Sequence, residues 1–199
     1  MPASLTEQIP PQTIDLIRSK VISILNEELA NQYTTFSDED YLLTTYLERF
    51  TPFNQNEYPA LNLRFVRSEL KSQDATGSIY TNTFWVELYV SNPSTDDDGG
   101  DKIGAIQLTK ILGACRHILK SSQYTRLGFT TPLIGNVSPR TLETSDLRDN
   151  MDAMMCMYGR FVLEIEACEN VELITPNMIE EHEATVRLYE TNKGYTWKT

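Results

Sequence analysis

Alternating apolar and polar residues make the stretch 157–169, MYGRFVLEIEACE, the most strongly patterned part of the chain. Side chains along a strand point alternately to its two faces, so this run predicts a strand with one apolar face and one mostly polar face. Such strands are typical of antiparallel sheets that are wetted on one side. Gly159 within the run predicts a bulge or a close backbone approach. The apolar face consists of Phe161, Leu163, Ile165 and Ala167.

Two more stretches alternate with the same period and predict strands at 60–67 and 83–91. The polar link between them, SELKSQDATGSIYTNT, is centred on Gly77 and has no tight-turn signature. We therefore expect a hairpin with a long loop. In the second strand one face carries Phe84, Val86, Leu88 and Val90, and the other carries Trp85, Glu87 and Tyr89.

Apolar residues recur at three- and four-residue steps in two longer stretches, which predicts amphipathic helices at 12–31 and 101–121. Prolines precede the first helix and basic residues lie in the last turns of the second, as helix ends prefer. A further helix is expected in YLLTTYLERF, because Ser37 and Asp40 resemble a capping box ahead of it. Two threonines within that stretch are poor helix formers.

The order of elements is helix, helix, strand, strand, helix, a short strand within 127–137, and the long strand. This order predicts a two-layer α+β domain, in which helices pack on one face of an antiparallel sheet. We expect an N-terminal arm at 1–11, the domain at 12–172 and a C-terminal extension at 173–199. The extension contains one weak strand, ATVRLYE, and ends with two aromatic residues that need burial, Tyr195 and Trp197.

Charge narrows the classes of partner. The chain of 199 residues has 17 basic and 28 acidic residues and a formal net charge of −11. Such a surface repels phosphate, and the sequence has no cluster of Lys and Arg of the kind that a groove for nucleic acid requires. No apolar run reaches the length of a membrane helix, and the N-terminus lacks a signal-peptide pattern, so we expect a soluble, unexported protein.

The candidate chemistry is sparse. The three cysteines include no CxxC, so neither a disulfide framework nor a zinc site is supported, and Cys115 is expected in the core. His117 falls off its helix's apolar stripe, and we expect it at the surface. Glu164 and Glu166 share one strand face and lie about 7 Å apart by the rise per residue, so acid–base chemistry stays open beside a solvated or salt-bridged pair.

The acidic turn NPSTDDDGGD does not match an EF-hand loop. Counting from Asp96, the sixth position is Asp101 and the twelfth is Gln107, where the motif requires Gly and Glu. A looser calcium site stays open. The simpler interpretation is a solvated turn in which Asp101 caps the helix that follows.

The outward face of the predicted sheet combines aromatic and charged side chains. That mixture suits a polar interface between subunits, and plain solvent exposure remains the alternative. Our candidates for a subunit or partner interface are Trp85, Glu87, Tyr89, Arg160, Glu164, Glu166, Tyr195 and Trp197, with Arg64 on the same face.

Over about 12–172 the chain resembles the tail terminator, or tail completion, proteins of long-tailed bacteriophages. The resemblance lies in the order and spacing of five stretches rather than in a signature motif. These are YPALNLRFV, FWVELYV, the acidic turn entering DKIGAIQLTKILGACRHIL, FTTPLIGNVSP and RFVLEIEACENV. Residues 32–58 and the chain after 172 lie outside the matched pattern.

This resemblance implies a virion protein that forms a ring, with six subunits as the expected number, on the tail tube. The ring would stop tube polymerisation, bind the tail tube protein and present the surface that joins the head. It implies no catalysis, no cofactor and no membrane, and DNA would pass through the centre without stable binding, which an acidic lumen favours. A head–tail connector or neck protein of the same virion, an unrelated α+β protein and a hydrolase are the alternatives.

Overall fold

The computed structural model describes residues 12–73, 77–91, 100–129, 133–147, 156–170, 183–187 and 194–198. The chain separates into two compact units, Met1–Glu169 and Asn170–Thr199. The helices of the larger unit are α1 (Thr13–Phe36) and α2 (Gly100–Lys120), with short 3-10 turns at Glu39–Tyr41, Gln55–Glu57 and Ser122–Tyr124. Its strands are β1 (Thr44–Leu47), β2 (Ala60–Gln73), β3 (Gly77–Ser91), β4 (Ile134–Leu147) and β5 (Cys156–Asn170).

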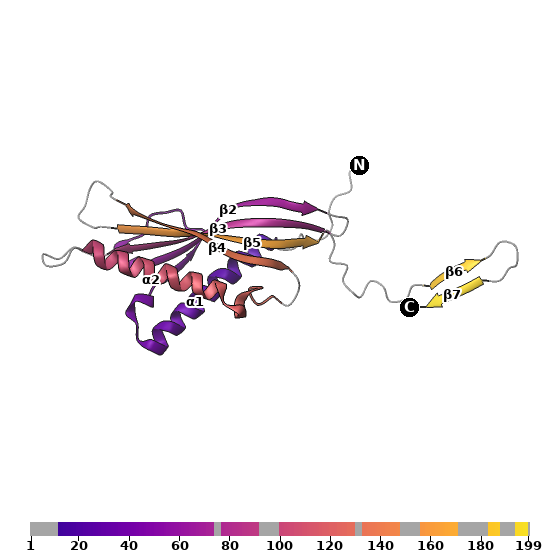
Figure 1. The fold of residues 1–199 in the computed structure, drawn as a ribbon, viewed down its shortest axis with the longest axis horizontal. Coiled ribbons are helices and arrows are strands. Elements are labelled where there is room, and N and C mark those ends of the chain that lie inside the picture. The colour runs from indigo at the N-terminus through magenta and orange to yellow at the C-terminus, as the bar shows by residue number, and fades with distance from the viewer. Residues whose placement is uncertain are drawn as a thin grey trace. The chain divides into compact units, whose positions relative to one another are not determined.

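The five strands form one sheet in the order β1-β2-β3-β5-β4. The pairs β2–β3 and β4–β5 are antiparallel, whereas β1 runs parallel to β2. The two long helices lie on the same side of this sheet (Figure 1). The predicted α+β class with helices on one face is therefore confirmed, and the sheet is mixed rather than purely antiparallel.

The core lies between the helices and the inner face of the sheet. α1 contributes Ile17, Val21, Leu25 and Leu29, which recur at four-residue steps and are 0–1% exposed. They belong to one buried cluster with residues of α2 and with the apolar faces predicted for β3 and β5, and each such burial stabilises the fold by about 2 kcal/mol. Those strand faces are fully buried at Phe84, Val86, Leu88, Phe161, Leu163, Ile165 and Ala167. As expected, Cys115 is buried and His117 is exposed.

Gly159 allows α2 to approach β5 closely. A Cβ atom at this position would lie 2.6 Å from Cδ2 of Leu108 and 2.8 Å from Cδ1 of Leu112. The pairing of β5 with β4 is continuous here, with Thr144 opposite Gly159, so no bulge interrupts that pairing. Of the two roles predicted for this glycine, the close approach is confirmed.

The helix expected in YLLTTYLERF is wrong. After α1 the chain makes one 3-10 turn and then forms β1, which pairs with β2 from Ala60 to Leu63. The side chain of Asp38, not Ser37, caps that turn, because it accepts a hydrogen bond from the backbone N–H of Asp40. β-Branched threonines favour an extended backbone, and the free edge of β2 supplies the pairing partner.

The prediction of a long polar loop between β2 and β3 is also wrong. β2 continues to Gln73 and β3 begins at Gly77, so most of the expected loop belongs to the two strands. Backbone pairing does not require apolar side chains, and the outer half of β2 is exposed, so polar residues are tolerated there. For the same reason β4 is longer than the short strand expected within 127–137. It pairs with β5 across two register shifts, between Ile134 and Val137 and between Pro139 and Leu142.

The smaller unit contains a two-stranded antiparallel hairpin, β6 (Glu183–Arg187) and β7 (Gly194–Lys198). β6 begins one residue before the predicted ATVRLYE strand. Tyr195 lies opposite Val186 and Trp197 opposite Ala184. The N-terminal arm at 1–11 and the acidic residues 96–98, for which a looser calcium site stayed open, lie outside the described residues. Asp101 is the second residue of α2 rather than its cap.

A candidate interaction surface on the outer sheet face

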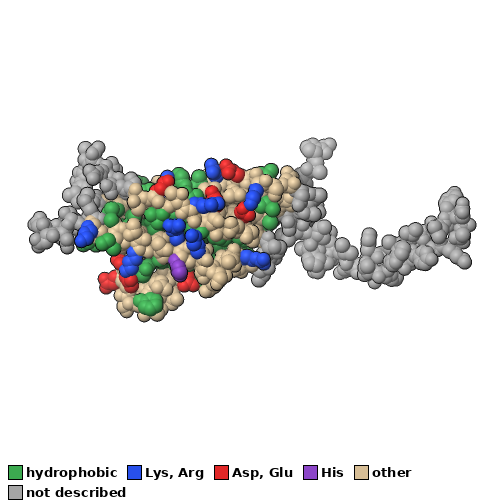
Figure 2. Space-filling view, in the orientation of Figure 1, with side chains coloured by type: hydrophobic (Ala, Val, Ile, Leu, Met, Phe, Trp, Pro, Cys, Tyr) green, Lys and Arg blue, Asp and Glu red, His purple; other side chains and the backbone are tan. Residues whose placement is uncertain are grey.

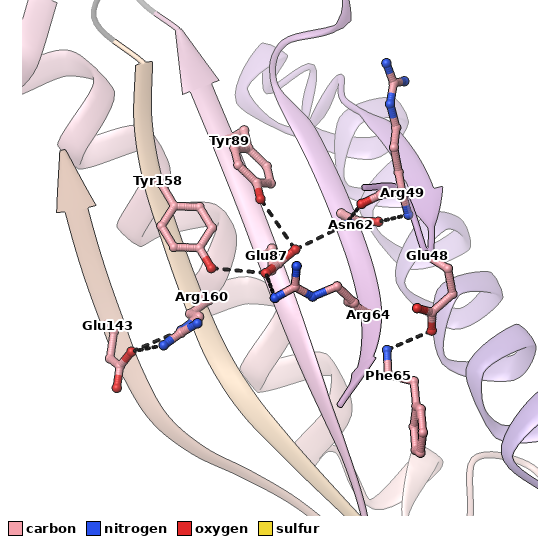
Figure 3. Close-up of polar contacts among 10 residues, drawn as sticks. All are labelled: Glu48, Arg49, Asn62, Arg64, Phe65, Glu87, Tyr89, Glu143, Tyr158 and Arg160. Carbon is pink, nitrogen blue, oxygen red and sulfur yellow. Dashed lines mark hydrogen bonds and ion pairs between the residues drawn. The ribbon is translucent and has the colours of Figure 1, made fainter. Parts of the chain in front are cut away.

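The outer face of the central strands brings most of the predicted surface residues together. Register places Asn62 opposite Glu87 and Arg64 opposite Trp85, and Tyr158 and Arg160 come from β5 on the other side of β3 (Figure 3). Each alternates with core residues of its own strand, so all of them project from the face that the helices leave uncovered. We call these residues, together with Tyr89, the outer-face cluster.

Glu87 is the centre of this cluster and is only 2% exposed. Its Oε2 accepts hydrogen bonds from Nδ2 of Asn62 (3.1 Å) and the hydroxyl of Tyr89 (3.4 Å). Its Oε1 accepts one from the hydroxyl of Tyr158 (3.1 Å) and lies 3.4 Å from a guanidinium nitrogen of Arg64. Donors from three strands therefore offset the cost of burying this carboxylate. Glu87 lies on the face expected from the sequence, but it is buried, whereas the sequence predicted an interface residue.

The two tyrosines remain protonated donors over the physiological range. Burial, reinforced by the negative charge of Glu87, raises the pKa of Tyr158 to about 12. The same two causes raise the pKa of Tyr89. Their rings also pack together, with centroids 5.0 Å apart, so the network is both hydrogen-bonded and close-packed. Both oxygens of Glu87 are thus engaged by the protein's own donors.

Trp85 is held between two arginines. The Cζ atom of Arg64 lies 4.5 Å from the Trp85 ring centroid and that of Arg160 lies 4.1 Å from it. Arg160 also donates from Nε and a terminal nitrogen to one oxygen of Glu143 on β4, at 3.0 and 2.9 Å. The guanidinium of Arg64 further approaches the ring of Phe50, which is 75% exposed. Cation–π contacts of this kind fix the orientation of a half-buried tryptophan.

A loop that the sequence did not connect with this face, residues 48–58, is anchored to it. Asn62 accepts a hydrogen bond from the backbone N–H of Arg49 (3.1 Å) and donates one to its carbonyl (3.0 Å). The ring of Phe53 packs 4.8 Å from that of Tyr89, between centroids. Asn62 therefore joins the loop to the Glu87 network, since it bonds to both.

Within this loop the side chain of Arg49 is held by Glu57. The two are joined by hydrogen bonds of 2.6 and 2.9 Å, and the Tyr46 hydroxyl donates to the same carboxylate at 2.8 Å. These bonds, above all those from Arg49, lower the pKa of Glu57 to about 2. The Arg49 guanidinium stacks on the rings of Tyr46 and Phe53, at 4.5 and 4.6 Å from their centroids.

Glu164 and Glu166 are each bound by a basic residue of another strand. Glu164 accepts a hydrogen bond from Arg140 of β4 at 2.9 Å, and Glu166 forms an ion pair with Lys71 of β2. Each carboxylate thus has its own cation on a different strand, which is the salt-bridged arrangement that the sequence left open. Basic and acidic side chains also lie interspersed on the face shown in Figure 2.

The structure thus brings five of the residues predicted for this face into one cluster, Arg64, Trp85, Glu87, Tyr89 and Arg160. Glu164 and Glu166 are further along β5, and Tyr195 and Trp197 belong to the other unit. Two members were missed, Asn62 and Tyr158, although the two-residue period of their strands places them on the outer face. Nothing in the local pattern pointed to Arg49, Phe53 or Glu57.

The described part of the chain holds neither a metal-binding cluster nor a membrane-spanning helix. No group of three or more His, Cys, Asp or Glu side chains is arranged there to hold a metal ion. Of the helices in the same part, none is long and apolar enough to cross a membrane. Neither a protein-family model nor a curated protein matches the sequence.

Proposed function

We propose that this chain is a structural virion protein that forms a ring on the tail tube of a bacteriophage, ends tube polymerisation and supplies the head-joining surface. The observation that carries the proposal is the outer-face cluster. A tryptophan held between two arginines, beside tyrosines that are fixed by a buried carboxylate, has the composition and rigidity of an energetic centre of a protein interface. The resemblance to tail terminator proteins then supplies the kind of assembly.

Three features support a binding role for this cluster. The side chains that form it are already ordered by bonds within the chain, so little conformational entropy would be lost when a partner binds. Ion pairs at the edge of the cluster, Arg160 with Glu143 and Arg140 with Glu164, carry charges of both signs, as polar rims of interfaces do. Phe50 adds an exposed aromatic ring next to Arg64. Proteins of this kind would assemble by contacts rather than by chemistry on a substrate.

The direct test combines the solution mass of the purified protein, negative-stain images and a tube-length assay. The protein would be added to the polymerising tail tube protein of the same virus. Rings with a central hole, and tubes that stop growing with a ring at one end, would support the proposal. Tubes that grow to the same lengths with and without the protein would contradict it. Binding to head-side proteins without an effect on tubes would instead indicate a neck protein.

A further inference from the structure

The edge strand β1 lacks most of the protections that sheet edges have. Residues 41–47, YLLTTYL, contain no charge, proline or glycine. In the described chain β1 pairs with β2 alone. Exposed strand edges normally carry charges, prolines or bulges, because their free N–H and C=O groups attract other strands. A short edge strand is also protected, and this is the one protection of these that β1 has, since it is four residues long.

The other free edges of the same sheet do have such protections. The opposite edge strand, β4, contains Pro139 and two register shifts. The part of β2 that extends beyond β1 has two register shifts of its own and exposes the charged residues Arg67, Glu69 and Lys71. The first β2 N–H beyond the pairing, that of Phe65, donates to a carboxylate oxygen of Glu48 at 2.7 Å (Figure 3). The unprotected edge is thus confined to β1.

Hydrogen bonds to the β2 side determine which groups of β1 are free. The N–H of Thr44 donates to the carbonyl of Pro59 at 3.0 Å, and that of Glu48 donates to Leu63 at 2.9 Å. In a strand the backbone groups of successive residues point to opposite sides. The N–H and C=O groups of Leu43, Thr45 and Leu47 therefore point away from β2.

We propose that this edge pairs with the same edge of a second copy, antiparallel, about a two-fold axis between the two Thr45 residues. This register is set by the free groups, because hydrogen-bonded pairs in an antiparallel ladder need outward-pointing residues on both strands. Leu43 then lies opposite Leu47 of the second copy, and Thr44 lies opposite Tyr46. No charged side chain faces another between residues 43 and 47, so the cross-strand repulsion of like charges is avoided.

The lack of charge at this edge makes it compatible with a second copy as the occupant. Each chain has a formal net charge of −11, so two copies repel one another over most of their surface. The uncharged strip 41–47 is a place where they can approach with little repulsion. Large apolar side chains lie in it or shortly after it: Leu42 is 60% exposed, Leu47 39% and Phe50 75%. Pairing of two edges would remove part of this apolar surface from water. The inference does not depend on the ring proposed above.

The test is the solution mass of the full chain over a range of concentrations, measured by sedimentation velocity. Thr45→Pro removes an outward N–H without touching the bonds to β2, and it should raise the dissociation constant of the dimer at least about tenfold. Thr45→Val is the matched control. Valine keeps the β-branched shape and loses only the hydroxyl, which lies 3.4 Å from Oδ1 of Asn26. This variant should leave the dissociation constant of the dimer unchanged. Circular dichroism would verify that both variants fold.

A second variant, Leu47→Lys, places a charge on an exposed position that would face Leu43 of the other copy, and it should weaken the dimer without unfolding the monomer. A wild-type chain that stays monomeric at every concentration, or a dimer that Thr45→Pro leaves unchanged, would overturn the proposal. Rings that persist in Thr45→Pro would leave the tail-tube proposal intact. A β1-dependent dimer that never forms rings or caps tubes would instead contradict the tail-tube proposal alone.

Discussion

Tyr158 of β5 donates a hydrogen bond of 3.1 Å to Oε1 of Glu87 on β3, and Glu87 is 2% exposed. The carboxylate is buried on the face of the sheet that carries no helix, where a charged residue would ordinarily be solvated. Its burial is possible because two tyrosines, an asparagine and an arginine supply its hydrogen bonds and charge. The outer face is therefore an ordered structure in its own right.

Tyr158→Phe should lower the free energy of unfolding by about 2 kcal/mol, because it removes a neutral donor from a buried charged acceptor. Glu87→Ala should cost more, about 3 kcal/mol, since it leaves Asn62 and Arg64 without their shared partner. Urea denaturation would measure both. Tyr33→Phe, at an exposed position on α1, is the control and should change stability little. If Tyr158→Phe and Tyr33→Phe lowered the free energy of unfolding equally, the hydrogen bond from Tyr158 to Glu87 would contribute nothing to stability.

Gly159→Ala and Gly113→Ala should change stability in opposite directions. The new methyl at 159 would meet Leu108 at 2.6 Å, and this overpacking should cost about 2 kcal/mol. At Gly113, within α2, nothing lies within 4 Å of an added Cβ, so alanine should stabilise the helix by about 0.5–1 kcal/mol. Thermal unfolding of both variants provides the comparison, and a stabilised Gly159→Ala would contradict the close approach of α2 and β5.

Glu57 should make stability depend on pH in acid. Its pKa is about 2 in the folded protein, against 4.5 for a free group. Because the folded value is the lower one, the unfolded chain binds the proton first. The stabilisation is then present above pH 4.5 and is lost as pH falls toward 2. The unfolding free energy of the wild type minus that of Glu57→Gln should therefore shrink over this interval. A difference that is constant with pH would mean that Arg49 does not act on this carboxyl.

Trp85→Ala should weaken assembly if the outer-face cluster is the centre of an interface. Truncation of such a residue typically costs at least about 2 kcal/mol of binding, or roughly a 30-fold loss of affinity. Analytical ultracentrifugation and the tube-length assay would record the loss. Ile106→Ala is the matched control, since Ile106 is 57% exposed on α2, away from the cluster. If both variants assemble equally well, the interface lies elsewhere.

Local sequence determined the parts of the fold in which apolar residues recur at a regular spacing and form one buried face. The two-residue period from Phe161 to Ala167 and the four-residue steps from Ile17 to Leu29 each predict one buried face, and the structure confirms both. The outward face that holds Trp85 and Arg160 followed from the same alternation. A core position must be apolar whatever its neighbours are, so it can be recognised without knowledge of the fold.

Tertiary structure decided the remainder. β1 is a strand because the edge of β2 was available to pair with it, whereas its own residues resembled a capped helix. The hairpin of β2 and β3 extends through polar residues, because the bonds that hold it are in the backbone. Glu87 is buried because Asn62, 25 residues away, and Tyr158, 71 residues away, converge on it from neighbouring strands. Such pairings depend on which segments meet in space, and this information is absent from any local window of sequence.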